Sequence, residues 1–240
     1  MRLRYYFSVL CVVLTFWLIG FLTVSCNREK ADSPGPEYPN PAVQVLNSDE
    51  GQDIILLSYL NPVFQHAVVN FFRELTGSFE VASVVLSNAV TYNIDPALAF
   101  ALCYEESGYN PRAVNRNQND TVDRGLFQLN NASFPKLAAD DFFNPGVSAR
   151  YGLSHLRWCL NTMGTEVAAL AMYNAGHNRV FTVGTPKSTL DYISRILKRQ
   201  RKIEDLFAAE YPRIAQAESQ SEEKKEKPPF RLSLLTPLGR

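Results

Sequence analysis

One apolar helical stretch constrains the fold of this chain more than any other feature, because it ends in carboxyl groups beside a polar loop. Asp95-Pro96 supplies a helix cap and a proline for the first helical position, and a helix is expected over Ala97 to Glu106. A turn at Gly125-Leu126-Phe127-Gln128 then brings the chain back. This layout predicts a glutamate at the end of a buried helix, facing a cleft. Apolar surroundings raise the pKa of such a glutamate, which makes it a candidate general acid.

The rest of the folded part also shows apolar residues at helical spacing, from Asp49 to Leu206. Further helix starts are predicted at Pro62, Ser78, Asn144-Pro145, Thr165 and Ser188 or Thr189. Alternation typical of strands is weak, and only Arg124 to Leu129 could form a short strand. The sequence therefore predicts a mainly α fold with loops around a cleft.

The composition narrows the classes of function. Of the 240 residues, 46% are apolar, which is enough for one good-sized domain with appendages. The formal net charge is zero, so no basic field points to nucleic acid, and nothing argues against a polar sugar substrate. His66, His155 and His177 are scattered without metal-ligand spacing. We expect no metal and no cofactor.

The first 26 residues read as an export signal. Arg2 and Arg4 precede an uncharged apolar run, which ends in Leu22-Thr23-Val24-Ser25-Cys26. The pattern is similar to a bacterial lipoprotein signal over 1–25, with lipid attached to Cys26, although Thr23 stands where leucine is usual. An uncleaved membrane anchor is the alternative, because the run is just long enough to span. Both place the remainder on a membrane at the periplasmic side of the cell envelope.

Composition divides the remaining chain into four segments. Residues 26–48 are rich in proline and polar residues and read as a flexible tether. Residues 49–78 form an N-terminal helical extension, and 79–210 form the main domain. The end, 211–240, carries a mixed-charge run before Pro228-Pro229 and is predicted to be disordered.

A series of short motifs in a fixed order resembles the soluble lytic transglycosylase (SLT) domain. The series is Glu106-Ser107, Asn110-Pro111 with Ala113, Gly125 to Gln128, Ala171 to Gly176, and Thr189 with Tyr192. The resemblance covers Phe79 to Lys202. It implies a goose-type-lysozyme-like helical fold and an enzyme that cuts peptidoglycan strands between N-acetylmuramic acid (MurNAc) and N-acetylglucosamine (GlcNAc).

The resemblance also implies roles for single residues. Glu106 would protonate the glycosidic oxygen and then act as base, so that the 6-hydroxyl attacks C1 and a 1,6-anhydro sugar forms. Gln128 and the pair Tyr173-Asn174 would line the cleft and bind substrate, or the pair would only join two helices. Tyr192 would bond the catalytic carboxyl or merely pack. Ser107 would bond the loop backbone or steady the glutamate. Glu105 is expected to be an exposed helix carboxylate.

The loop before the turn departs from the usual SLT pattern. Residues 115–123 look like the loop of chicken-type lysozymes and of the specialised transglycosylases of secretion systems. In those proteins an acidic residue follows the catalytic glutamate by seventeen positions, as Asp123 follows Glu106. Asp123 would act as nucleophile or stabilise an oxocarbenium ion, or it would only cap the turn. A hydrolysing muramidase that uses Glu106 and Asp123 is therefore an alternative function.

Two further questions stay open from the sequence. Cys103 and Cys159 could form a disulfide outside the cytoplasm, but their apolar stretches fit two buried free thiols equally well. A non-catalytic peptidoglycan-binding lipoprotein is a third reading of the chain. The expected partners are peptidoglycan glycan strands and a membrane reached through the lipid. A partner in an envelope-spanning machinery stays an open alternative.

Overall fold

The computed structural model describes residues 53–226 of the chain. The predicted signal peptide, the lipidation site Cys26 and the tether lie outside the described residues. None of the helices within 53–226 has the length and apolar character needed to cross a membrane.

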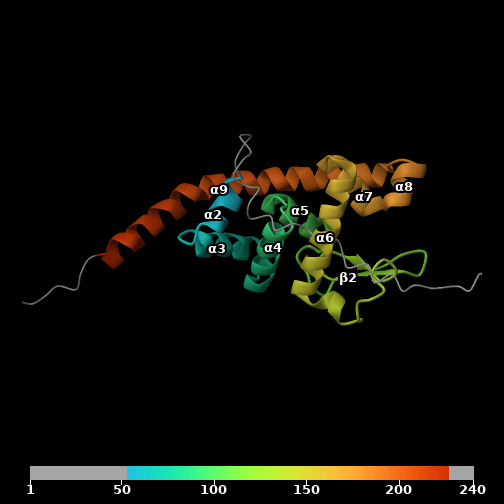
Figure 1. Ribbon diagram of the computed structural model, residues 1–240, viewed down its shortest axis with the longest axis horizontal. Coiled ribbons are helices and arrows are strands. Elements are labelled where there is room, and N and C mark those ends of the chain that lie inside the picture. Colours follow the sequence, from blue (N-terminus) through green and yellow to red (C-terminus); the bar gives the residue numbers. More distant parts are fainter. Residues whose placement is uncertain (1–52, 227–240) are drawn as a thin grey trace, which may run out of the picture. The chain divides into compact units, whose positions relative to one another are not determined.

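The described part is mainly α, as the sequence predicts, with one small sheet (Figure 1). The elements are α2 (Ile54–Leu60), α3 (Gln65–Thr76), α4 (Phe79–Thr91), α5 (Pro96–Ser107), β1 (Val114–Arg116), β2 (Val122–Arg124), β3 (Leu129–Asn130), η3 (Asp141–Phe143), α6 (Pro145–Met163), α7 (Glu166–Ala175), α8 (His177–Thr182) and α9 (Lys187–Glu226).

The central helix α5 spans Pro96–Ser107, one residue more at each end than the predicted Ala97 to Glu106. The Asp95 carboxylate accepts a hydrogen bond from the amide of Leu98 at 3.0 Å, and Pro96 takes the first helical position. Gly108 ends the helix in the left-handed conformation, with φ of 61°. Every residue from Pro96 to Cys103 is buried, so the apolar part of α5 forms the middle of the core and its carboxyl end reaches the surface of a cleft.

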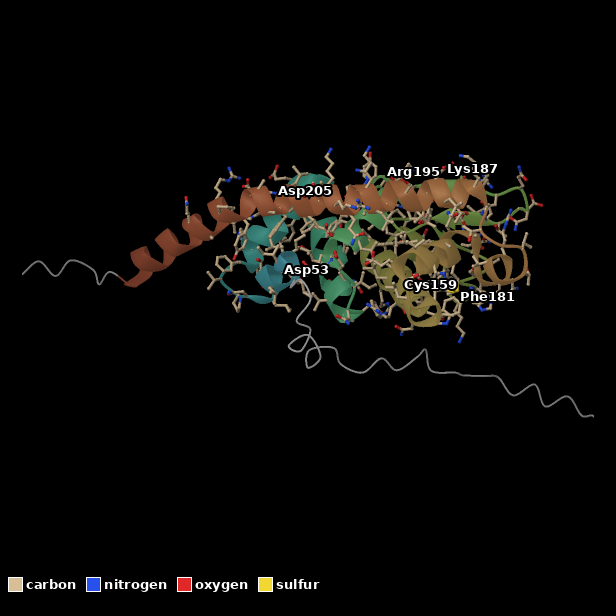
Figure 2. The ribbon with its side chains drawn as sticks, turned by 90° about the horizontal axis from the view of Figure 1, so that it is seen from above. Asp53, Cys159, Phe181, Lys187, Arg195 and Asp205 are labelled. Carbon is tan, nitrogen blue, oxygen red and sulfur yellow. The ribbon has the colours of Figure 1, made fainter. Side chains whose placement is uncertain are left out.

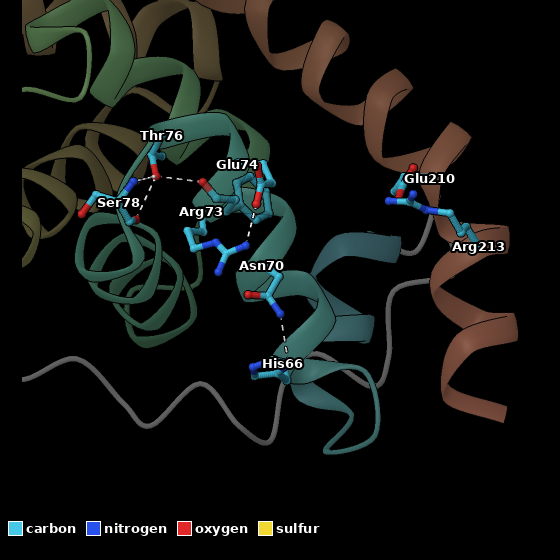
Figure 3. Close-up of polar contacts among 9 residues, drawn as sticks. His66, Asn70, Arg73, Glu74, Thr76, Ser78, Glu210 and Arg213 are labelled. Carbon is cyan, nitrogen blue, oxygen red and sulfur yellow. Dashed lines mark hydrogen bonds and ion pairs between the residues drawn. The ribbon is translucent and has the colours of Figure 1, made fainter. Parts of the chain in front are cut away.

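The capping residues place three other helices as predicted. Ser78 accepts from the amide of Val81 at 3.3 Å, Asn144 caps α6 and Thr165 caps α7. Figure 3 shows how α3 is joined to α4: the Thr76 hydroxyl donates to the carbonyl of Phe72 at 2.8 Å and accepts from the amide of Ser78 at 3.2 Å. These local bonds fix the turn between the N-terminal helices and the main domain.

The long helix α9 overturns the prediction of a disordered tail from 211 onward. It continues to Glu226 and runs beside α2, α5 and α7 (Figure 1). Ile214 is buried, and the Tyr211 ring lies 6.2 Å from the ring of Phe64. The helix persists past 210 because these apolar side chains pack on the N-terminal helices. Residues 227–240 of the predicted tail lie outside the described residues.

The N-terminal helices share the hydrophobic core of the main domain. Phe72 of α3 is fully buried and stacks on Phe100 of α5, with ring centroids 4.0 Å apart. The neighbouring Phe71, also on α3, meets Phe207 of α9 edge-on, with ring centroids 5.1 Å apart. The extension therefore supports the helix that carries Glu106.

The small sheet differs from the single short strand that was expected at 124–129. Three antiparallel strands follow the order β1-β2-β3, and residues 125–128 form a turn instead of a strand. Positive φ values at Gly125 (78°) and Gln128 (45°) break the extended conformation there. Each strand has three residues or fewer, which is too short for alternation to show in the sequence. The short helix α8 was also not predicted.

Candidate active site

A cleft of about 780 Å³ opens where the sheet and its loops face α5, α6, α7 and α8. Its lining includes five of the seven predicted site residues, namely Glu106, Asp123, Gln128, Tyr173 and Asn174. Tyr192 reaches this group through a hydrogen bond to Glu106. Ser107 is not part of the lining.

Glu106 lies at the carboxyl end of α5 and is partly buried. Its environment raises the pKa of the carboxyl group from 4.5 to about 7, chiefly because burial removes water from the charged form. The negative charges of Asp123 and Glu105 raise the pKa further. The Tyr192 hydroxyl donates to Oε1 of Glu106 and acts in the opposite direction. Glu106 is therefore poised to give and take a proton near neutral pH.

Glu105, the neighbour of Glu106, has different surroundings and is not the exposed carboxylate that was expected. Its side chain is only 10% exposed and pairs with Arg195 at 2.7 Å and Arg199 at 3.5 Å, both on α9. Arg199 also lies over the ring of Tyr104, at 3.2 Å from the ring centroid. Of these two adjacent carboxyl groups, Glu105 thus meets arginine side chains of α9, and Glu106 faces the cleft. Such a separation of environments is how proteins assign different proton-transfer roles to carboxyl groups.

Tyr192→Phe gives a direct test of the Glu106 environment. Since the tyrosine hydroxyl stabilises the ionised form of Glu106, its loss should raise the pKa of Glu106 further. If protonated Glu106 is the active form, the alkaline limb of the pH–activity profile should move to higher pH. The profile on purified cell wall measures this shift. A limb that stays in place would mean that the Tyr192 contact does not influence the titrating group.

Asp123 stands on β2 and is held by amide groups on both carboxylate oxygens. Asn130 donates to Oδ1 at 2.7 Å, and Asn117 donates to Oδ2 at 2.9 Å, with Asn115 at 3.4 Å from the same oxygen. The strand register explains these contacts, because Asp123 is paired with Asn115 on one side and Asn130 on the other. Asp123 is therefore fixed as a negative charge in the cleft that also contains Glu106.

The turn at 125–128 is seated on α6 by close contacts. The amide of Phe127 donates to Oγ of buried Ser148 at 3.2 Å. Gly152, one helical turn further along α6, leaves room for Phe127, since a Cβ added there would lie 2.4 Å from Cβ and Cγ of that side chain. A Cβ added at Gly125 would lie 1.9 Å from the carbonyl oxygen of Phe142. The position of the turn, and with it of Gln128, depends on these small residues.

The other side of the same turn is bonded to the helices that carry Glu106 and Tyr173. The Ser107 hydroxyl donates to the carbonyl of Leu126 at 2.8 Å, which supports the loop-bonding alternative for this residue. The Tyr173 hydroxyl donates to the carbonyl of Phe127 at 3.2 Å. These two bonds tie α5 and α7 to a single turn, so the cleft walls keep a fixed spacing.

Gln128 and Asn174 present amides to the cleft while bonding the fold. Nε2 of Gln128 donates to the carbonyls of Gly125 at 2.9 Å and Ala113 at 3.2 Å. Within residues 53–216 its amide oxygen has no hydrogen bond and is available to a ligand donor. Oδ1 of Asn174 accepts from the Thr189 hydroxyl at 2.8 Å, so this residue joins α7 to α9 and lines the cleft as well.

The two cysteines are buried and free, which settles the question of a disulfide between them. The Cys103 thiol lies 3.8 Å from the carbonyl oxygen of Leu126, and Cys159 lies 3.9 Å from Nε2 of His155. Burial raises the pKa of both thiols, that of Cys159 to about 12. In the part of the chain that the structure describes, no group of His, Cys, Asp or Glu side chains is arranged to hold a metal ion.

Several lining residues were not foreseen from the sequence. Phe134, His155 and Trp158 form part of the cleft wall, and His177 lines it too. Their spacing in the sequence shows no common period, because they come from a loop and two different helices. The asparagine-rich loop 115–123 was a clearer sign of the site in the sequence than these lining residues, since amide side chains of this loop hold Asp123.

Comparison with known proteins finds similar sequences over the part of the chain that forms this cleft. Residues 83–194 match the transglycosylase SLT domain family. The chain is 30% identical to protein IpgF of Shigella flexneri over 118 residues, which are 47% of this chain and 75% of that protein. It is 27% identical to invasion protein IagB of Salmonella typhi over 128 residues, which are 50% of this chain and 76% of that protein. No solved structure matches the chain significantly.

Proposed function

This chain belongs to the transglycosylase SLT domain family, and we propose that it is a lytic transglycosylase that remodels the cell wall. The bond cleaved is the β-1,4 bond between MurNAc and GlcNAc of peptidoglycan, and the product carries 1,6-anhydro-MurNAc. One observation carries the proposal: Glu106 stands in the cleft wall with its pKa raised to about 7.

Glu106 supplies the proton chemistry of both steps. Its protonated carboxyl group donates to the glycosidic oxygen, so the bond to C1 of MurNAc breaks and GlcNAc leaves with its hydroxyl restored. The resulting carboxylate then accepts the proton of the MurNAc 6-hydroxyl as that oxygen attacks C1. The group ends protonated, as it began, and no water is consumed. The hydroxyl of Tyr192 keeps Oε1 in position throughout.

Asp123 acts in this proposal as a fixed charge that stabilises the developing oxocarbenium ion. Asparagine amides donate to both of its oxygens and hold the carboxylate in place. A hydrolysing muramidase remains the second candidate, because Asp123 lines the same cleft as Glu106. The two functions differ in their products.

A digest of purified cell wall, analysed by mass spectrometry, tests the proposed reaction. Wild-type protein should release muropeptides that are lighter by one water than the reducing products of hydrolysis. Reducing ends alone would favour the muramidase, and release of no products would favour the non-catalytic peptidoglycan-binding lipoprotein. Asp123→Asn keeps the shape of the side chain and removes its charge, so it serves as a matched variant in the same digest.

We also propose that the chain acts in the cell envelope as a lipoprotein, attached to a membrane through lipid on Cys26. The basic start, the apolar run and the small residues before the cysteine support this proposal. Metabolic labelling with a radioactive fatty acid tests it, since wild type should incorporate the label and Cys26→Ser should not. Equal labelling of the two proteins would contradict attachment at Cys26. A partner in an envelope-spanning machinery is an open alternative, and a pull-down from intact envelopes tests it.

A further inference from the structure

A groove of about 910 Å³ lies between α3 and the part of α9 that continues past the main domain. Figure 3 shows its two sides, with Asn70, Arg73 and Glu74 on α3 and with Glu210 and Arg213 on α9. Among the described residues, none that lines this α3–α9 groove also lines the cleft with Glu106. What occupies the groove is therefore independent of the proposed function.

The floor of the α3–α9 groove is apolar. Phe71 and Leu75 of α3 are partly buried against the core, and Ile214 of α9 is buried. Leu206, which also lines the groove, is 45% exposed. A single exposed leucine is ordinary, but this one borders a hollow that contains three further apolar side chains. Such a groove favours an occupant that brings apolar side chains of its own.

The charges at the rim of the groove cancel one another. Arg73 pairs with its neighbour Glu74 at 2.6 Å, and Arg213 pairs with Glu210 one helical turn earlier. The described lining thus carries no net charge and has no field that attracts a polyanion such as nucleic acid. Apolar contact is the main attraction that the groove offers.

One wall of the groove bends toward the other. Pro212 lies inside α9, and a proline within a helix removes a backbone hydrogen bond and bends the axis. In Figures 1 and 2 the last part of α9 turns toward the side on which α3 lies, whereas the stretch with Arg195 and Asp205 is straight. The groove therefore lies on the inner side of the bend.

We propose that the segment 227–240 of this chain folds back and occupies the α3–α9 groove. The mixed-charge run ends before Pro228-Pro229, and the residues that follow have a different pattern. Apolar and polar residues alternate in Phe230-Arg231-Leu232-Ser233-Leu234. An extended segment with this pattern places its three apolar side chains on one face and its two polar side chains on the other. The apolar face fits the groove, and the polar face stays in water.

The segment is long enough to reach the groove. Glu226 lies twelve residues beyond Ile214, which is about 18 Å along a straight helix. Leu234 lies eight residues beyond Glu226, and an extended chain of that length covers about 26 Å. Pro228-Pro229 cannot continue the helix and favours a change of direction there. The surplus of length leaves room for the turn, so Leu234 comes to lie beside Ile214.

Photo-crosslinking of the full-length chain tests where the segment lies. A benzophenone amino acid at position 234, in place of Leu234, should form cross-links within one chain to the peptides of α3 and α9 that line the groove. Leu206→Arg puts a charge into the groove and should remove most of these cross-links. Leu190→Arg should keep them, because Leu190 is a similarly exposed leucine of α9 (52%) outside the groove lining.

The other outcomes of the cross-linking overturn the proposal. Cross-links between two chains would show that a second copy fills the groove. Cross-links to residues elsewhere in the same chain, or none at all, would show that the segment does not lie there.

Melting temperatures give a second measurement. Leu234→Asp should lower the melting temperature by about 2 to 6 °C, because one leucine loses its apolar contacts. Ser233→Asp, on the polar face of the alternation, should leave it unchanged. Leu206→Arg combined with Leu234→Asp should lower it no further than the larger single effect, since both changes break the same contact. Additive losses, or equal melting temperatures for wild type and Leu234→Asp, would contradict docking in the groove.

Discussion

Glu106→Gln should lower the rate of cell-wall cleavage by about two to four orders of magnitude, the usual contribution of a general acid–base group. The amide keeps the size of the side chain and can still accept from the Tyr192 hydroxyl, but it cannot give a proton to the glycosidic oxygen. Release of soluble muropeptides per unit time measures the rate.

The neighbouring residue supplies the control for this loss. Glu105→Gln changes an adjacent carboxyl group on the same helix, which pairs with Arg195 and Arg199 outside the cleft lining. It should retain most of the wild-type rate. Equal losses in the two variants would point to disturbance of the end of α5 and would remove the assignment of the acid to Glu106.

Glu106→Gln should also stabilise the protein at high pH. The folded-state pKa of Glu106, about 7, lies above its ordinary value of 4.5, so the stabilising effect of its protonated form is complete below about pH 4.5. That effect is lost as the pH rises through 7, where wild type must bury a charge. Glu106→Gln avoids this cost, which amounts to at most about 3 kcal/mol. Its melting temperature relative to wild type should rise between about pH 5 and pH 9.

Gly152→Ala should damage both stability and activity, because the added methyl group meets the Cβ and ring of Phe127 at 2.4 Å. The clash involves the base of a buried side chain, so relief requires movement of the turn at 125–128 or of α6. Overpacking of this kind costs about 1 to 3 kcal/mol of unfolding free energy. Displacement of the turn also moves Gln128 and the carbonyl groups that Tyr173 and Ser107 bind. Denaturant unfolding and the muropeptide assay measure the two effects.

Gly146→Ala is the matched control on the same helix. A methyl group there would have its nearest contact at 3.4 Å, with the Asn144 side chain. The higher helix propensity of alanine should leave the protein as stable as wild type, or more stable by up to about 1 kcal/mol. If Gly152→Ala behaves in the same way as Gly146→Ala, then close packing at Gly152 does not position the turn.

The capped starts of several helices, and the position of Glu106 at the end of a buried helix, were predictable from the sequence because they depend on local chemistry. Capping by Ser78, Asp95 and Asn144 needs only a side-chain oxygen and an amide three residues away. The order of short motifs likewise identified the family before any contact was known. Such features are encoded within a few residues, so the sequence alone specifies them.

The features that were not predicted depend on contacts between distant parts of the chain. The ion pair of Glu105 with Arg195 joins residues that are far apart in the sequence, so helical periodicity carried no sign of it. The continuation of α9 past 210 follows from packing of Tyr211 and Ile214 against the N-terminal helices. The strands at 114–130 are too short to show a pattern and are fixed by the amides around Asp123.

Digestion of cell wall in water enriched in a heavy oxygen isotope tests the central claim most directly. If Glu106 directs attack by the sugar's own 6-hydroxyl, the released anhydro sugars contain no oxygen from solvent, and mass spectra are the same in heavy and ordinary water. Hydrolysis would place one solvent oxygen on C1 of each new end and shift every product mass. Unlabelled anhydro products from wild type, with none from Glu106→Gln, are the predicted result. Labelled reducing ends as the main product would contradict it.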